Sequence, residues 1–185
     1  TQSDPQLATA WGNLANCYLQ YGKTKEAENA CIRSISLNPN LFNSHFLLSL
    51  IFLKQKKLQE AEKALLQTIE LKPDFAIAHF NLGTVLKDLG KIKDAEISIR
   101  KVIELKPDYA NAHSNLGLIL KDLYKFEEAE LVTRKAIELN PDYAVAHNNL
   151  GTILNNLGKQ EEAKASYLKS IELNPDYAEA HNNLG

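Results

Sequence analysis

Methionine is absent from this sequence, and cysteine occurs only twice, at Cys17 and Cys31. Two cysteines are too few for a disulfide framework or a cysteine-based metal site. We expect both to be small, reduced core residues, because a buried free thiol behaves as a small hydrophobic side chain. An intracellular, cytoplasmic location is the corresponding expectation. The missing start methionine and the short, polar stretch before residue 8 predict a piece of a longer protein without a signal sequence.

An excess of one charge is also lacking. The chain carries 21 basic and 23 acidic side chains, for a formal net charge of −2. This balance gives no field that would attract a polyanion, so we expect no nucleic-acid partner. The longest apolar stretch, 46–53, is interrupted by Ser49 and is much shorter than the roughly 20 residues needed to cross a bilayer. We therefore expect no membrane partner.

Catalytic motifs are missing as well. The sequence has no glycine-rich phosphate loop, no His-Glu-x-x-His, no nucleophile elbow and no Cys-x-x-Cys. We predict that these residues form no enzyme and hold no cofactor or metal. A catalytic domain elsewhere in the full-length protein stays open.

What the sequence does contain is a 34-residue period. It governs every proline: Pro5, Pro39, Pro73, Pro107, Pro141 and Pro175. The same interval separates every histidine: His45, His79, His113, His147 and His181. When the proline is numbered as position 32, the sequence divides into the end of a truncated repeat at 1–7, five full repeats at 8–41, 42–75, 76–109, 110–143 and 144–177, and the start of a truncated sixth repeat at 178–185. A fixed period of this length is the signature of a repeat architecture.

Each repeat predicts two helices. Apolar or small residues at positions 4, 7, 8, 11 and 14, and again at 20, 24, 27, 28 and 30, follow the spacing of one helical face. Position 15, which ends the first helix, is glycine in three repeats but Lys56 and Tyr124 in the other two, where we expect strain or another geometry. The prolines end the second helix, and we expect the aspartates that follow them to cap the next one. Small residues at positions 8 and 20 mark the closest approach of the two helices.

These residues resemble the tetratricopeptide repeat, with an aromatic-like residue at 4, leucine at 7, a small residue at 8, glycine at 15, alanine at 20 and proline at 32. Stretches such as PDYAVAHNNLG look most similar to the repeat arms of O-linked N-acetylglucosamine transferases and their bacterial relatives. The resemblance implies an all-α fold, an α-solenoid of helix-turn-helix repeats wound into a right-handed superhelix, with first helices lining a concave binding face.

On that face the resemblance predicts a row of asparagines at position 6, interrupted only by Leu47. Its members are Asn13, Asn81, Asn115, Asn149 and Asn183. Because a primary amide both donates and accepts hydrogen bonds, the row suits the backbone of an extended peptide. The alternative is that these amides bond locally between neighbouring hairpins.

The second repeat predicts an apolar patch on the same face. Its residues are Phe46, Leu47, Leu50 and Leu53, with Ile77 and Phe80 beside them from the third repeat. Exposed clusters of this kind mark contacts. A partner's hydrophobic side chains would seat there while Asn148 and its neighbours hold a polar segment. The alternative is that other repeats or a second copy of the chain cover the patch.

Two further patterns have simpler interpretations. The histidines at position 4 stand where Trp11 stands in the first repeat, which favours core packing over a metal ladder. Lysine at position 16 and an acidic residue at position 19 form an i, i+3 arrangement, which we interpret as a solvated pair. Positions 2 and 5 carry no basic residue in any full repeat, so the family's clamp for the terminal carboxylates of chaperone tails is not expected.

The sequence therefore predicts a scaffold that binds a protein or peptide partner on its concave face. Two alternatives are a substrate-recruiting arm of a larger enzyme, such as a glycosyltransferase, and self-association through uncapped repeat ends.

Overall fold

The computed structural model describes residues 5–185, which form eleven α-helices and contain no strand. The first helices of the repeats are α1 (Pro5–Gln20), α3 (Phe42–Lys54), α5 (Ala76–Asp88), α7 (Ala110–Asp122), α9 (Ala144–Asn156) and α11 (Ala178–Leu184). The second helices are α2 (Thr24–Leu37), α4 (Leu58–Leu71), α6 (Ile92–Leu105), α8 (Phe126–Leu139) and α10 (Gln160–Leu173). The predicted all-α fold is confirmed. Residues 1–4 of the predicted partial repeat 1–7 lie outside the described residues.

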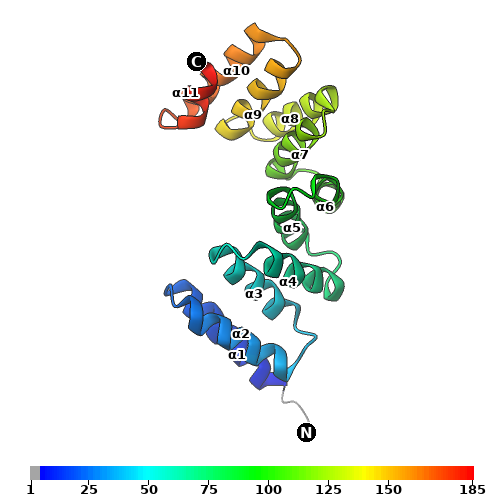
Figure 1. The fold of residues 1–185 in the computed structure, drawn as a ribbon, viewed down its shortest axis with the longest axis vertical. Coiled ribbons are helices and arrows are strands. Elements are labelled where there is room, and N and C mark those ends of the chain that lie inside the picture. The colour runs from blue at the N-terminus through cyan, green and yellow to red at the C-terminus, as the bar shows by residue number, and fades with distance from the viewer. Residues whose placement is uncertain (1–4) are drawn as a thin grey trace. The chain divides into compact units, whose positions relative to one another are not determined.

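The chain divides into two compact units, Thr1–Gly90 and Lys91–Gly185. In the first unit, α1 packs against α2 and α3 packs against α4, while α3 also contacts α1 and α2. In the second unit, α7 pairs with α8 and α9 pairs with α10, while α7 contacts α9 and α9 contacts α11. Within each unit, helical hairpins therefore stack on their neighbours in sequence (Figure 1).

The turn inside each hairpin uses a left-handed residue at position 15. Gly22, Gly90 and Gly158 have φ angles of 74° to 75°, and Lys56 and Tyr124 adopt the same region with φ of 60°. The residue after it closes the helix with a hydrogen bond from its N–H to the carbonyl five residues earlier, as Lys57 does to Phe52 at 2.9 Å. Lys56 and Tyr124 therefore keep the glycine geometry, at the cost that a side chain incurs in the left-handed region.

The turn between hairpins shows that the predicted aspartate cap is wrong. Asp74 does not cap α5, because the residue at the helix N-cap is Phe75, which makes no side-chain cap hydrogen bond. Instead, Lys72 to Phe75 form a turn in which the Phe75 N–H donates to the Lys72 carbonyl at 3.2 Å. Proline and aspartate occupy the two central positions of this turn, which suit both residues. The same bond recurs at Tyr109, Tyr143 and Tyr177.

The closest approach of the two helices of a hairpin lies where small residues were predicted. The alanines at position 20 are at most 2% exposed in every repeat. In the fifth repeat, a Cβ added to Gly151 would lie 2.5 Å from the ring of Tyr167 at position 24. Such a distance is shorter than any side chain tolerates, so glycine at position 8 is what admits the tyrosine there.

The two cysteines do not share one environment. Cys31 is fully buried with Ala15 and Ala27 in the core of the first unit, as predicted. Burial, together with the charge of Glu28, raises the pKa of the Cys31 thiol to about 12, so this cysteine stays a thiol. Cys17 is exposed, and the prediction that it is a core residue is wrong. It stands at position 10 of the repeat, which is not one of the apolar-face positions of the first helix.

The histidines are not a uniform core stripe either. Only His113 is buried, at 8% exposed, while the others are half-buried or exposed. Every Nε2 instead donates to the carbonyl of the proline six residues earlier, at 2.8 or 2.9 Å. Each imidazole therefore ties its helix to the preceding Pro-Asp turn. This polar role explains why histidine replaces tryptophan at position 4.

Ion pairs join neighbouring second helices in the second unit. Glu96 on α6 accepts from Lys125 at 2.9 Å and from Arg100, and Arg100 also bonds to Glu128 on α8. The arrangement repeats one hairpin later among Glu130, Arg134, Lys159 and Glu162. Lys125 and Lys159, at position 16, therefore pair with the preceding hairpin and not with the acidic residue three positions later, while both lysines are exposed, as predicted.

We expect Lys56→Gly to raise the free energy of unfolding by roughly 1 kcal/mol, because glycine removes the left-handed strain at φ 60°. Denaturant unfolding measures this. The control is Gln59→Gly, an exposed position inside α4, which should lower stability by about 1 kcal/mol. Equal changes in the free energy of unfolding at the two positions would show that Lys56 is not strained.

Acid should weaken the ion-paired hairpins. Burial raises the pKa of the Glu96 carboxyl, but hydrogen bonds from Lys125 and Arg100 outweigh it, so the pKa lies below its ordinary value. Lys159 and Arg134 lower the pKa of Glu130 in the same way. A lowered carboxyl pKa contributes stability that is complete above the unfolded pKa of about 4.5 and lost as pH falls through the folded value.

We therefore expect the variant with both Glu96→Gln and Glu130→Gln to lose less stability than the wild type between neutral and acidic pH. Urea unfolding at a series of pH values measures the slope. Glu127→Gln on the exposed side of α8 serves as the control and should keep the wild-type slope. Identical slopes for all three proteins would show that the ion pairs add nothing to stability.

Candidate functional site between α1 and α3

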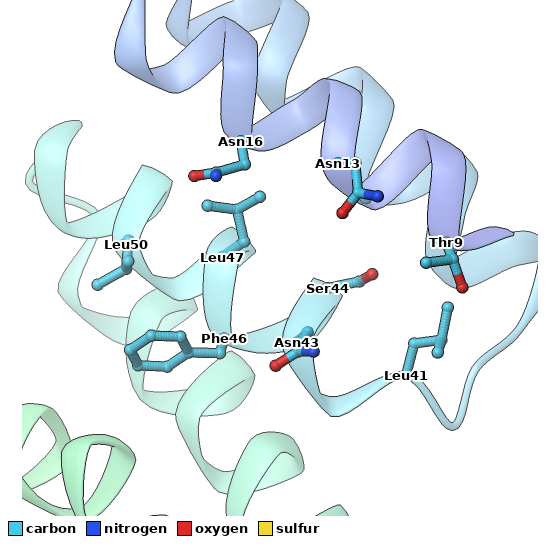
Figure 2. Close-up of a pocket in the computed structure, with 10 residues that line it drawn as sticks. Thr9, Asn13, Asn16, Leu41, Asn43, Ser44, Phe46, Leu47 and Leu50 are labelled. Carbon is cyan, nitrogen blue, oxygen red and sulfur yellow. The ribbon is translucent and has the colours of Figure 1, made fainter.

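A groove of about 310 Å³ opens between the first helices of repeats 1 and 2, within the first unit. This α1–α3 groove is lined by Thr9, Gly12, Asn13 and Asn16 of α1, by Asn43, Ser44, Phe46, Leu47 and Leu50 of α3, and by Leu41 just before α3 (Figure 2). Its residues come from positions 2, 5, 6 and 9 of the repeat, with Leu41 and Ser44 added. Positions 5, 6 and 9, which carry the predicted asparagine row and most of the predicted patch in the second repeat, therefore meet in one place.

The α1 wall presents unused polar groups. Asn13 and Asn16 are exposed, and their side-chain amides make no hydrogen bond within residues 5–185. Figure 2 shows both amides extending from α1 toward the α3 side of the groove. The two residues are i, i+3 neighbours and therefore share one helical face. A ligand in the groove can both donate to and accept from this wall.

The α3 wall is apolar except for Asn43 and Ser44 near the start of the helix. The Phe46 ring packs edge-to-face on Phe75, with ring centroids 4.9 Å apart, and this contact holds its position. Leu47 is only 9% exposed and belongs to the core cluster that contains Ile51 and Cys31. Leu50 lies one turn further along α3 and is half-buried. The wall therefore offers apolar surface that is already ordered before any ligand binds.

The predicted apolar patch is only partly present. Phe46, Leu47 and Leu50 line the groove, whereas Leu53, Ile77 and Phe80 do not. Ile77 is 47% exposed on α5, and Leu53 and Phe80 are half-buried. Leu47 is a core residue, so its assignment to an exposed patch is wrong. The reason is that α1 packs over this side of α3, which a helix considered alone does not show.

The predicted row of asparagines also differs from one repeat to the next. In the second unit, Asn149 is 3% exposed and donates to the Ser114 Oγ of the preceding hairpin at 2.9 Å. Asn183 likewise donates to the Oδ1 of Asn148 at 3.0 Å, and Asn148 is fully buried. Accessible amides were predicted at Asn148 and Asn149, and this is wrong, because the stacked first helices bury them. Local bonding between hairpins, the alternative interpretation, describes these residues.

The remaining members of the row are intermediate. Asn81 on α5 and Asn115 on α7 are half-buried. Asn13 alone combines an exposed amide with a place in a groove. One signal in the sequence marks this place: position 6 of the second repeat is Leu47, so α3 offers no amide to α1 there. Position 5 of the first repeat is Gly12, which has no side chain to offer and where an added Cβ would lie 3.1 Å from the Ser44 Oγ.

The α1–α3 groove is electrically neutral. Its ten lining residues include no acidic, basic or histidine side chain. Within residues 5–185, no three His, Cys, Asp or Glu side chains lie close enough together to hold a metal ion. The site can therefore form neutral hydrogen bonds and apolar contacts with a ligand. Proton transfer and nucleophilic attack would need groups that these ten residues do not supply.

Repeat-family models match most of the chain. Models described as Tetratricopeptide repeat match residues 8–41, 76–109, 110–143 and 132–165, and a model described as TPR repeat matches 50–90 and 153–185. The chain belongs to the tetratricopeptide repeat family. No match among curated proteins was found at the sequence level.

Solved tetratricopeptide structures share the fold at low sequence identity. YrrB, described as a TPR protein with an unusual peptide-binding site, is 20% identical with a TM-score of 0.82, covering 93% of this chain and 89% of YrrB. MamA 41-end from Desulfovibrio magneticus RS-1 is 21% identical with a TM-score of 0.86, covering 96% and 99%. PilF from Pseudomonas aeruginosa is 19% identical with a TM-score of 0.80, covering 95% and 80%. In the described part of this tetratricopeptide chain, no helix is long and apolar enough to cross a membrane.

Proposed function

We propose that this tetratricopeptide protein is an interaction scaffold that binds an extended protein segment in the α1–α3 groove. The observation that supports it best is the pairing of two unbonded asparagine amides on α1 with an ordered apolar wall on α3. A volume of about 310 Å³ is at the lower end of the roughly 300–1,000 Å³ typical of ligand pockets. It suits a few residues of a chain and not a folded domain.

Recognition would follow from the chemistry of the two walls. An extended backbone has unpaired N–H and C=O groups, and the amides of Asn13 and Asn16 complement both kinds. An apolar side chain of the same segment would contact Phe46 and Leu50. Because the segment has to become ordered, at a cost of about 2–5 kcal/mol, we expect micromolar affinity. The peptide-binding site named for YrrB supports the same class of ligand.

A second candidate function is that the chain is the substrate-recruiting arm of a larger enzyme, such as a glycosyltransferase. The asparagines at position 6, which resemble those of O-linked N-acetylglucosamine transferase arms, support it. In that case the α1–α3 groove would hold the substrate, and catalysis would belong to another domain of the protein.

Self-association is a third candidate. Leu7 and Leu14 on α1 are 45% and 37% exposed, and these apolar side chains would contact a second copy. Light scattering over a concentration series separates this candidate from the other two, because it predicts a mass that rises with concentration.

The groove is tested with peptides selected from a random display library against the intact chain. We expect Asn13→Ala and Asn16→Ala to weaken a selected peptide about fivefold each, since each removes roughly 1 kcal/mol of hydrogen bonding. Leu50→Ala should weaken it by a similar factor or more. Titration calorimetry measures the affinities, and thermal unfolding checks that each variant folds.

The matched control is Asn29→Ala, an exposed asparagine on α2 outside the groove, which should leave affinity unchanged. If selected peptides bind the wild type and all four variants equally, the α1–α3 groove is not the binding site.

A further inference from the structure

We propose that the α1–α3 groove selects an uncharged, extended segment with one large apolar side chain, taken from within a chain and not from its carboxyl end. This inference rests on the proposed function, because it names the ligand class of that same site. The presence of a groove does not by itself determine which peptide segments it prefers.

The lining of the α1–α3 groove carries less charge than that of other hollows on the molecule. A hollow on α6 and the turn before α8 has four charged residues among its six lining residues: Lys93, Glu96, Arg100 and Lys125. Another, between α8 and α10, includes Arg134, Glu138 and Lys169. In a chain with 24% charged residues, ten lining residues without a single charge set the α1–α3 groove apart from these two hollows, and the hollow beside it, lined by Gln6, Thr9, Ala10 and Asn13, is uncharged as well.

Placing a charged group of a ligand in the groove costs free energy. A carboxylate or ammonium that leaves water must be paired or hydrogen-bonded, or its burial is strongly unfavourable. The α1 wall offers two neutral amides, and the α3 wall offers Phe46, Leu47 and Leu50, so no opposite charge is available. A neutral peptide unit loses less on entering the groove, because the amides replace the water it gives up.

The one positive element nearby is the N-terminus of α3, where Leu41 and Asn43 line the groove. Its partial charge would favour a carboxylate. However, the N–H groups of Ser44 and His45 already donate to the Leu41 carbonyl, at 3.0 and 3.4 Å. Ser44 is buried, and its Oγ is engaged with Ser34 at 2.7 Å. Two N–H groups of the first turn of α3 and the Ser44 hydroxyl are therefore engaged, which reduces its attraction for an anion.

The apolar side chains of the α3 wall favour a large hydrophobic side chain in the ligand. The contact between Phe46 and Phe75 fixes one side of the groove, and Leu47 is held in the core behind it. A rigid apolar surface rewards a large hydrophobic side chain and gives a polar one no partner. Asn13 and Asn16 lie opposite, so backbone groups on both sides of that side chain can reach an amide. This requirement favours a residue inside a segment over one at its end.

The test uses four small probes in place of an unknown partner. These are the N-methylamides of N-acetylleucine, N-acetylaspartate and N-acetyllysine, and N-acetylleucine with its free carboxylate. Each is titrated into the labelled, intact chain, and the side-chain amide signals of Asn13 and Asn16 are followed by NMR. We expect the leucine methylamide to bind at least about tenfold more tightly than any charged probe.

Two variants should reverse the preference of the groove for the neutral probe. Asn16→Lys places a cation on the exposed α1 wall, and Leu50→Lys places one on the α3 wall. Both should make the free carboxylate of N-acetylleucine bind more tightly than its methylamide. Asn16→Lys leaves the core untouched, so it remains informative if Leu50→Lys fails to fold. Asn29→Lys, outside the groove, should keep the wild-type order.

Equal binding of neutral and charged probes to the wild type would overturn this inference and leave the proposed function standing. Failure of all four probes to shift the groove signals would also overturn it, because the groove would not accept a single apolar residue. Selected peptides that are insensitive to groove substitutions would instead overturn the proposed function. The two failures are therefore distinguishable.

Discussion

Stacking of one first helix on the next is the interaction on which the rest of the structure depends. In the second unit, α9 contacts α7 and α11 contacts α9, and this stacking buries Ser114, Asn148 and Asn149 at positions 5 and 6 of the repeat. Polar side chains at both positions then bond to each other across the interface, as Asn149 does with Ser114. Buried polar groups need such partners, and the stack engages the Nδ2 of Asn149 and the Oδ1 of Asn148, while the Nδ2 of Asn148 is buried without a hydrogen bond.

The α1–α3 groove arises where this pairing fails. Leu47 occupies position 6 of α3, and Gly12 occupies position 5 of α1, so neither offers a side-chain hydrogen bond across the interface. Leu47 joins the core instead, and the amides of Asn13 and Asn16 remain unbonded beside the groove within the described residues. Two apolar or missing side chains thus turn a sealed interface into a place where a ligand can bind. The ion pairs between second helices lie elsewhere and stabilise the stack without approaching the groove.

Much of the fold could be predicted because the determinants are local and repeated. The prolines, the glycines at position 15 and the 34-residue period define every helix and turn in the described chain. Expectations failed where the outcome depends on a neighbouring helix or on the backbone of a turn. Asp74 occupies a turn and not a cap, Cys17 is exposed, and Lys125 pairs with the preceding hairpin. The positions that form the site were predicted, but which amides stay free depends on contacts between repeats.

The central claim is that stacking leaves the amides of Asn13 and Asn16 free and ties up that of Asn149. Solvent exchange of side-chain amide protons, measured by NMR on the intact chain, tests it without any ligand. The account predicts near-unprotected exchange at Asn13 and Asn16, and exchange at Asn149 slowed at least about tenfold by its buried hydrogen bond. Exchange at Asn149 as fast as at Asn13, or strong protection of Asn13, would contradict it.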